Sequence, residues 1–180
     1  MDGNQTGNSN TAVGYIALYE NTTAGSNTAV GRSALYANTT GNNNVSVGAY
    51  ALDANTTADN NVAIGYEALT TNTTGTQNAA IGYAALEKNT TANNNTAVGY
   101  KALEENTTGT GHVAIGANAS DAITTNNYTT AIGFNALTAN TASNIVSVGA
   151  YSLNANTSGD YNTACGYSAL ELNTTGAQNT

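Results

Sequence analysis

The residues that could do chemistry are few and scattered along the chain. Among its 180 residues are eleven acids, one histidine and one cysteine. Glycan hydrolysis requires two carboxylates that face one sugar bond, but Glu104 and Glu105 are adjacent and are therefore expected to diverge. His112 has no second histidine beside it, which favours a corner residue over a metal ligand. We predict no catalytic residue, no metal site, no cofactor and no enzyme activity.

Motifs and charge exclude further classes of function. The chain has no Gly-rich phosphate loop ending in Gly-Lys-Ser or Gly-Lys-Thr, no His-Glu-x-x-His, no nucleophile elbow and no calcium-binding nonapeptide. Its net charge is −8, and only Arg32, Lys88 and Lys101 are positive, so nucleic acid and anionic lipid would be repelled. No apolar run approaches the roughly 20 residues of a membrane span. We expect no nucleic-acid partner and no membrane insertion by this segment.

The chain is built from a 17-residue repeat, which determines where each side chain lies, and residues 95–111 are a typical copy of it. A glycine closes the first segment of each repeat: Gly14, Gly31, Gly48, Gly65, Gly82, Gly99, Gly116 and Gly133 are spaced by 17, Gly149 follows after 16, and Gly166 after 17. A fixed period of this kind indicates a solenoid. We predict one repeat domain over residues 1–180, with coils that begin near residues 10, 27, 44, 61, 78, 95, 112, 129, 145 and 162.

The first segment of each repeat predicts a short strand. Residues 62–64 read Val-Ala-Ile, in which two β-branched residues point to one face and a small residue points to the other. A helical repeat is excluded because only about seven residues separate the glycine from the following Asn-Thr-Thr, too few for a stable helix. The predicted fold is all-β, a parallel β-solenoid of about ten 17-residue coils. At about 4.8 Å per coil the rod would be on the order of 50 Å long.

Two columns of the repeat predict the core. The buried residues are expected to be Val13, Leu18, Val30, Leu35, Val47, Leu52, Ile64, Leu69, Ile81, Leu86, Val98, Leu103, Ile115, Ile132, Leu137, Val148, Leu153, Cys165 and Leu170. Cys165 takes the Val/Ile position and is therefore predicted to be a small buried apolar residue.

A third column is always small, which suggests that another backbone approaches it closely. One coil encloses too little volume to bury all of its own apolar side chains, so an apolar surface would remain exposed. A large exposed apolar patch usually marks an interface. We therefore expect a homotrimer. The predicted inter-chain face is Ala12, Ala29, Ser46, Ala63, Ala80, Ala97, Ala114, Ala131, Ser147 and Ala164.

The corners and an aromatic column complete the repeat. Asn-Thr-Thr segments such as residues 72–74 predict tight turns, where stacked asparagines can form amide ladders. Rings follow the glycine in most repeats, and an arginine beside Tyr15 could make a cation–π contact. The candidate recognition surface is Tyr15, Arg32, Tyr66, Tyr83 and Tyr100. The same rings could equally cover a thin core. Residues 112–128 break the pattern, since Ser120 and Ile123 replace the usual leucine and asparagine.

The chain resembles the head repeats of YadA-like trimeric autotransporter adhesins. The resemblance rests on Asn44-Val-Ser-Val-Gly48, Asn61-Val-Ala-Ile-Gly65 and His112-Val-Ala-Ile-Gly116, each followed by an Ala-rich segment. The longer unit is also similar to repeats of phage-type tail-fibre proteins. The adhesin resemblance implies a left-handed parallel β-roll, three chains side by side, and attachment to a host surface. The chain departs from the adhesin pattern in its 17-residue unit, its leucine column, and threonine at positions such as Thr11, Thr28, Thr96 and Thr163.

These observations lead to one main functional hypothesis and one alternative. The main hypothesis is a structural or adhesive segment of an extracellular trimeric fibre, on a cell surface or a virion. Such a segment would bind a host-surface protein or glycan, or would act as a spacer that sets the length of the fibre. The alternative is an ice-binding β-solenoid, in which stacked threonines form a flat array. Adjacent threonines such as Thr22 and Thr23 point in opposite directions in an extended chain, which weakens this alternative.

Overall fold

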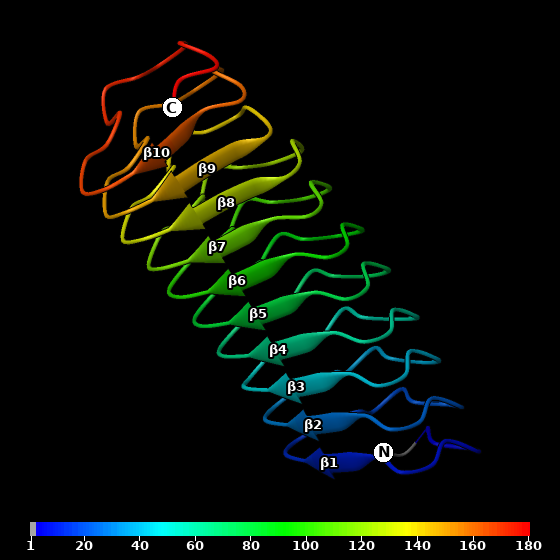
Figure 1. The fold of residues 1–180 in the computed structure, drawn as a ribbon. Coiled ribbons are helices and arrows are strands. Elements are labelled where there is room, and N and C mark those ends of the chain that lie inside the picture. Colours follow the sequence, from blue (N-terminus) through cyan, green and yellow to red (C-terminus); the bar gives the residue numbers. More distant parts are fainter. Residues whose placement is uncertain (1–2) are drawn as a thin grey trace.

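The computed structural model describes residues 3–180 and shows a stack of coils, each contributing one strand to one parallel sheet (Figure 1). These residues contain strands, turns and bends but no helix. The strands are β1 (Thr11–Val13), β2 (Thr28–Val30), β3 (Val45–Val47), β4 (Val62–Ile64), β5 (Ala79–Ile81), β6 (Thr96–Val98), β7 (Val113–Ile115), β8 (Thr129–Ile132), β9 (Ile145–Val148) and β10 (Thr163–Cys165). They pair in sequence order. The predicted parallel β-solenoid is confirmed.

Equivalent residues of successive repeats lie side by side in the sheet. Ala63 of β4 pairs with Ala80 of β5, 17 residues later. The period falls to 16 once, where Ala131 of β8 pairs with Ser147 of β9. Each column of the sequence is therefore a row along the rod with a spacing of about 4.8 Å.

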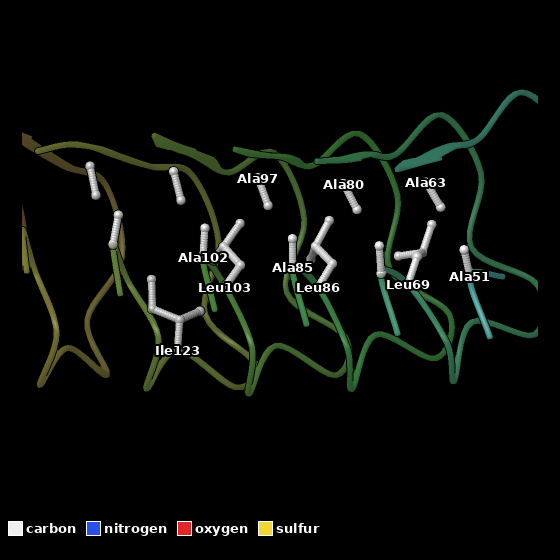
Figure 2. Packing of buried hydrophobic residues seen from close by; sticks show 14 of the residues in the cluster. Ala51, Ala63, Leu69, Ala80, Ala85, Leu86, Ala97, Ala102, Leu103 and Ile123 are labelled. Atoms are coloured by element: carbon white, nitrogen blue, oxygen red, sulfur yellow. The ribbon is translucent and has the colours of Figure 1, made fainter. Parts of the chain in front are cut away.

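Each coil is filled from two facing walls. The leucines at positions 18, 35, 52, 69, 86, 103, 137 and 153 are fully buried, as predicted. The opposite wall is the strand, whose small middle residue also points inward. Figure 2 shows Ala80 directed from the strand toward Leu86, an arrangement that repeats in the neighbouring coils. The Ser46 hydroxyl donates across the coil to the carbonyl of Ala51 at 2.7 Å, so the two walls are in direct contact.

The prediction that the third strand residue is buried is wrong. In the chain described here these side chains are exposed or half-buried: Val13, Val30, Val47, Ile64, Ile81, Val98, Ile115, Ile132, Val148 and Cys165. Val13 is 57% exposed and Ile81 is 38% exposed. The leucine of the facing wall occupies the interior, which leaves room only for alanine or serine on the strand. Leu170 is 39% exposed because its coil is the last in the stack.

The predicted inter-chain face is also wrong, for the same reason. Its residues point into the coil and not outward: Ala29, Ser46, Ala63, Ala80, Ala97, Ala114, Ala131 and Ser147 are fully buried, and Ala164 is 4% exposed. Ala12 is partly buried against the core. The backbone that approaches this small column belongs to the opposite wall of the same coil, so the column cannot contact another chain.

The leucine wall has an unusual backbone. Every leucine of the column, from Leu18 to Leu170, has a positive φ between 48° and 59°. The residue two places earlier, such as Ala84 before Leu86, also has a positive φ. This left-handed conformation costs a non-glycine residue roughly 1–2 kcal/mol. Complete burial of a leucine side chain stabilises the folded state by about 1.5–3 kcal/mol, which offsets that cost.

One row of stacked asparagines lines the corner of the rod, and we call it the corner ladder. Asn72 is typical: its Nδ2 donates to Asn55 Oδ1 at 3.1 Å and to the carbonyl of Gly75 at 2.9 Å. Its Oδ1 accepts from Asn89 Nδ2 at 2.8 Å. The ladder runs through Asn4, Asn21, Asn38, Asn55, Asn72, Asn89 and Asn106, and resumes at Asn140, Asn156 and Asn173. The predicted amide ladder is confirmed.

A second row, the strand ladder, precedes the strands. Asn44 Oδ1 accepts the backbone N–H of Asn61 at 2.9 Å, and Asn44 Nδ2 donates to the carbonyl of Ala58 at 2.8 Å. The row comprises Asn10, Asn27, Asn44, Asn61, Asn78 and Asn95, followed by His112. Because buried polar groups are costly without partners, these two rows fix the coils to one another.

Candidate functional surfaces

The outward side of the sheet is a long uncharged surface of mainly apolar residues, which we call the outer sheet face. It consists of Thr11, Val13, Thr28, Val30, Val45, Val47, Val62, Ile64, Ala79, Ile81, Thr96, Val98, Val113, Ile115, Thr130, Ile132, Val146, Val148, Thr163 and Cys165. None of these residues is charged. They are exposed or half-buried along all ten strands, so the face is continuous from β1 to β10. A contiguous apolar surface of this extent usually marks an interaction site.

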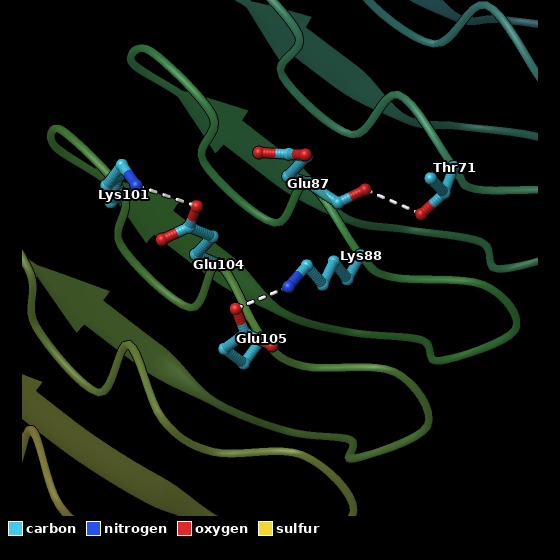
Figure 3. Close-up of polar contacts among 6 residues, drawn as sticks. All are labelled: Thr71, Glu87, Lys88, Lys101, Glu104 and Glu105. Atoms are coloured by element: carbon cyan, nitrogen blue, oxygen red, sulfur yellow. Dashed lines mark hydrogen bonds and ion pairs between the residues drawn. The ribbon is translucent and has the colours of Figure 1, made fainter.

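The charged residues of the described chain lie outside the strands, and several form local pairs. Lys101 Nζ contacts Glu104 Oε1 at 2.9 Å, and Lys88 Nζ contacts Glu105 Oε1 at 2.5 Å (Figure 3). Glu104 and Glu105 thus bind different lysines, as their predicted divergence requires. Exposed pairs of this kind contribute little to stability, because water and salt screen them.

Three partly buried carboxyl groups follow the leucine column. Burial raises the pKa of Asp53, of Glu87 and of Asp121 above the ordinary values. Glu104 raises the pKa of Glu87 and of Asp121 further by charge repulsion. No group of three histidine, cysteine, aspartate or glutamate side chains within residues 3–180 is placed to hold a metal ion. No cavity opens in the surface of that same part of the chain.

Only part of the candidate recognition surface comes together as a continuous row, namely its last three tyrosines. Tyr66, Tyr83 and Tyr100 are 44–50% exposed and stack with ring centroids 5.5 and 5.3 Å apart. Their planes are within 16° of parallel, so neighbouring rings cover each other's faces and present their edges and hydroxyls to solvent. Tyr15 is separate from this stack and is 71% exposed. Arg32 is also exposed.

The cation–π contact of Arg32 differs from the expected one. Its guanidinium lies over Tyr50, 5.3 Å from the ring centroid, in the following coil. The sequence placed the tyrosine of that coil one position later than in most repeats, and this shift brings the ring toward the arginine. Lys101 makes a similar contact with Tyr100 at 5.8 Å.

The two threonines of each corner have different environments. The first, such as Thr73, donates its hydroxyl to the backbone carbonyl of Thr90 in the next coil at 3.1 Å. The second is exposed in seven successive coils: Thr23, Thr40, Thr57, Thr74, Thr91, Thr108 and Thr125. The rod therefore has one exposed threonine row, and the adjacent row is engaged with the backbone.

His112 takes the place of an asparagine in the strand ladder and is fully buried. Its Nε2 lies 2.8 Å from the carbonyl of Asn126, which can only accept, so Nε2 carries the hydrogen. Its Nδ1 is then unprotonated and accepts hydrogen bonds from the hydroxyl of Thr129 at 2.7 Å and from the Thr129 N–H at 3.3 Å. Burial lowers the pKa of His112 from 6.5 to about 4. The residue is a neutral replacement for asparagine.

Comparison with known proteins adds no relative. No protein-family model, no curated protein and no solved structure matches the chain. Residues 3–180 contain no helix with the length and hydropathy needed to cross a bilayer. The outer sheet face, which sequence reasoning assigned to the core, is thus the main functional candidate on the surface. The sequence already contained an indication of this face, because neither of the two outward strand columns contains a charged residue.

Proposed function

We propose that this chain is a structural and adhesive segment of an extracellular fibre, on a cell surface or a virion, built from three parallel copies. The observation that supports it most is the uncharged outer sheet face, which runs the full length of the rod. Side-by-side packing of copies through this face yields a stiff rod with repeated exterior side chains. The resemblance to trimeric adhesin heads and to tail-fibre repeats supports the same reading.

The distribution of charge favours another copy of the chain as the partner on this face. The whole chain carries a net charge of −8, so two copies repel each other through most of their surfaces. The outer sheet face is the side on which this repulsion is weakest. Packing of valine and isoleucine side chains there would remove apolar surface from water at about 25 cal/mol per Å².

The area of the outer sheet face is modest. Nine strand spacings of about 4.8 Å and a width of about 10 Å give a footprint of roughly 430 Å² per chain. Two such faces bury about 860 Å², below the roughly 1,200–2,000 Å² of a stable two-chain interface. A third copy around the same axis leaves the area per chain unchanged, so the proposed number of three copies rests on the resemblance to trimeric adhesin heads.

A charge on the outer sheet face is expected to dissociate the assembly. In Ile81→Glu, three carboxylates would be brought together near one axis, where desolvation and mutual repulsion cost several kcal/mol. Size-exclusion chromatography with light scattering should show a folded monomer. Thr74→Glu adds the same charge at an exposed corner and should leave the assembly intact. Equal masses for the two variants would contradict the proposed interface.

The adhesive part of the proposal assigns contact with a host-surface protein or glycan to the exposed aromatic row. A fluorescent preparation of the whole chain, applied to a glycan array and to immobilised matrix proteins, should be retained by multivalent contacts. Tyr83→Ala interrupts the stack of Tyr66, Tyr83 and Tyr100 and should reduce retention. Thr74→Ala should retain full binding. No retention of the intact chain would limit its role to spacing.

Ice binding is the second candidate, and the exposed threonine row favours it. Seven stacked threonines present a regular line of methyl and hydroxyl groups. The neighbouring row, such as Thr73, is held by backbone hydrogen bonds, so the array is one residue wide. A thermal hysteresis assay separates the candidates: the fibre proposal predicts no hysteresis, whereas an effect abolished by Thr74→Tyr would favour ice binding.

A further inference from the structure

The seventh coil, residues 112–128, interrupts both asparagine rows. In the corner ladder the position after Asn106 is taken by Ile123, which cannot donate a hydrogen bond. The buried Oδ1 of Asn106 consequently has no hydrogen-bond partner in the described structure. In the strand ladder the asparagines are interrupted after Asn95 by His112, Thr129 and Ile145 and resume at Asn162. His112 maintains hydrogen bonds to the neighbouring coils in this row, so the side-chain hydrogen bond that is missing at the junction is the one of the corner ladder.

The core of the same coil is also rearranged. Ser120 stands at the leucine position, and Ile123, which is fully buried, supplies the apolar volume from the asparagine position instead. The Ser120 hydroxyl is buried and, like Asn106 Oδ1, has no partner within residues 3–180. A buried polar group without a partner costs roughly 1–3 kcal/mol. This junction is thus a weak point in an otherwise regular stack.

We propose that the seventh coil is an acid-sensitive break point, at which protonation of His112 uncouples the two parts of the rod. His112 links three coils: its backbone N–H donates to Asn95 Oδ1 at 2.9 Å, and the Nδ1 atom of its neutral ring accepts from Thr129. A proton added at Nδ1 would face the N–H of Thr129, which is a donor, so this 3.3 Å contact would be lost. The Thr129 hydroxyl can turn and accept from the protonated ring, but a positive charge buried without a counter-ion would favour opening to water. The inference does not depend on the fibre role.

No charged side chain is in position to stabilise the protonated ring. Its neighbours on the adjoining coils are Asn95, Gly109, Asn126 and Thr129, none of which titrates. The pKa of His112 is lowered by burial and raised only by the Asn126 carbonyl, with no contribution from a carboxylate. The acids of this region, Glu104, Glu105 and Asp121, interact with one another on the leucine wall.

The direction of the pH effect follows from these pKa values. A histidine with a pKa of 6.5 when opened and about 4 when folded stabilises the closed state fully above pH 6.5. That stabilisation is lost progressively as the pH falls toward 4. At pH 5 the opening equilibrium should be about 20-fold more favourable than at neutral pH. The raised pKa of Asp121 acts in the opposite direction, since a carboxyl that is protonated more readily in the fold stabilises it on acidification.

Hydrogen–deuterium exchange of the whole chain tests this proposal. Exchange protection of residues 106–130 is measured relative to residues 28–81 in the same sample, which removes the intrinsic effect of pH on exchange. The relative protection should fall on acidification from pH 7 to pH 5, by up to about 20-fold. His112→Asn restores the ladder residue and removes the titrating group, so its relative protection should not change with pH.

Two other results would overturn the proposal. One is an acid-induced loss of protection that is uniform along the rod or equal in His112→Asn. The other is a titration of the folded protein by nuclear magnetic resonance in which His112, the only histidine, shows an ordinary pKa. Unchanged relative protection in the unsubstituted chain would also contradict it.

Discussion

Gly65→Ala is expected to disrupt the middle of the rod and to be among the most destabilising single substitutions. Gly65 has a φ of +142°, a region that side-chain-bearing residues rarely enter. A Cβ at this position would also lie within 2.6 Å of the carbonyl carbon of Gly82 in the next coil. Backbone cannot move aside without breaking the sheet register. We expect a loss of roughly 4 kcal/mol or more, which is exceptional for one substitution.

Gly166→Ala is the matched control, because it introduces the same backbone strain at a positive φ without a steric clash against the next coil. Its φ is +132°, but the nearest atom to an added Cβ is Ala169 Cβ, at 3.9 Å. Only the conformational cost of roughly 1–3 kcal/mol then applies. Urea unfolding monitored by circular dichroism should show a much larger shift of the midpoint for Gly65→Ala. Equal shifts would contradict the close approach of coils at the glycine row.

Asn72→Ala is expected to have the second-largest effect. The substitution removes three hydrogen bonds and leaves Asn55 Oδ1, the Gly75 carbonyl and Asn89 Nδ2 without this partner inside the rod. The Gly75 carbonyl still accepts from Asn61 Nδ2, so two buried groups are left unsatisfied. Each costs about 1–3 kcal/mol, and a total of roughly 2–6 kcal/mol is expected. The same unfolding measurement applies, with Thr74→Ala as the exposed control.

Asn72→Asp distinguishes the ladder from simple loss of packing. Aspartate has nearly the same shape and retains the acceptor for Asn89, but an ionised aspartate lacks both donors of Nδ2. Destabilisation similar to that of Asn72→Ala is expected at neutral pH, with partial recovery once acid protonates the carboxyl. A substitution to aspartate that leaves stability unchanged would show that the corner ladder does not hold the coils together.

The fold could be predicted from the sequence because the period and the local residue types act together. The 17-residue spacing of glycine determines which residues stack, and the asparagine rows follow from stacking alone. A parallel sheet then follows because equivalent strands of successive coils are neighbours. The single 16-residue repeat changes only a corner, where Asn140 Nδ2 donates to the carbonyl of Ala142.

The direction of the strand side chains could not be obtained in this way. Alternation in Val62-Ala63-Ile64 shows that the two faces differ, but not which one is inside. The answer depends on the size of the facing residue, and buried Leu69 fills the space that Ile64 would need. The left-handed conformation of the leucines was equally hidden, because leucine has no preference for a positive φ. Closure of a narrow coil requires it.

The most direct test of the account is the mass of the unsubstituted chain in solution. Sedimentation equilibrium at neutral pH should give about 54 kDa, which is three times the chain mass of 18.1 kDa, because the outer sheet faces of three copies cover one another. A stable, compact species of 18.1 kDa at all protein concentrations would contradict the proposed assembly.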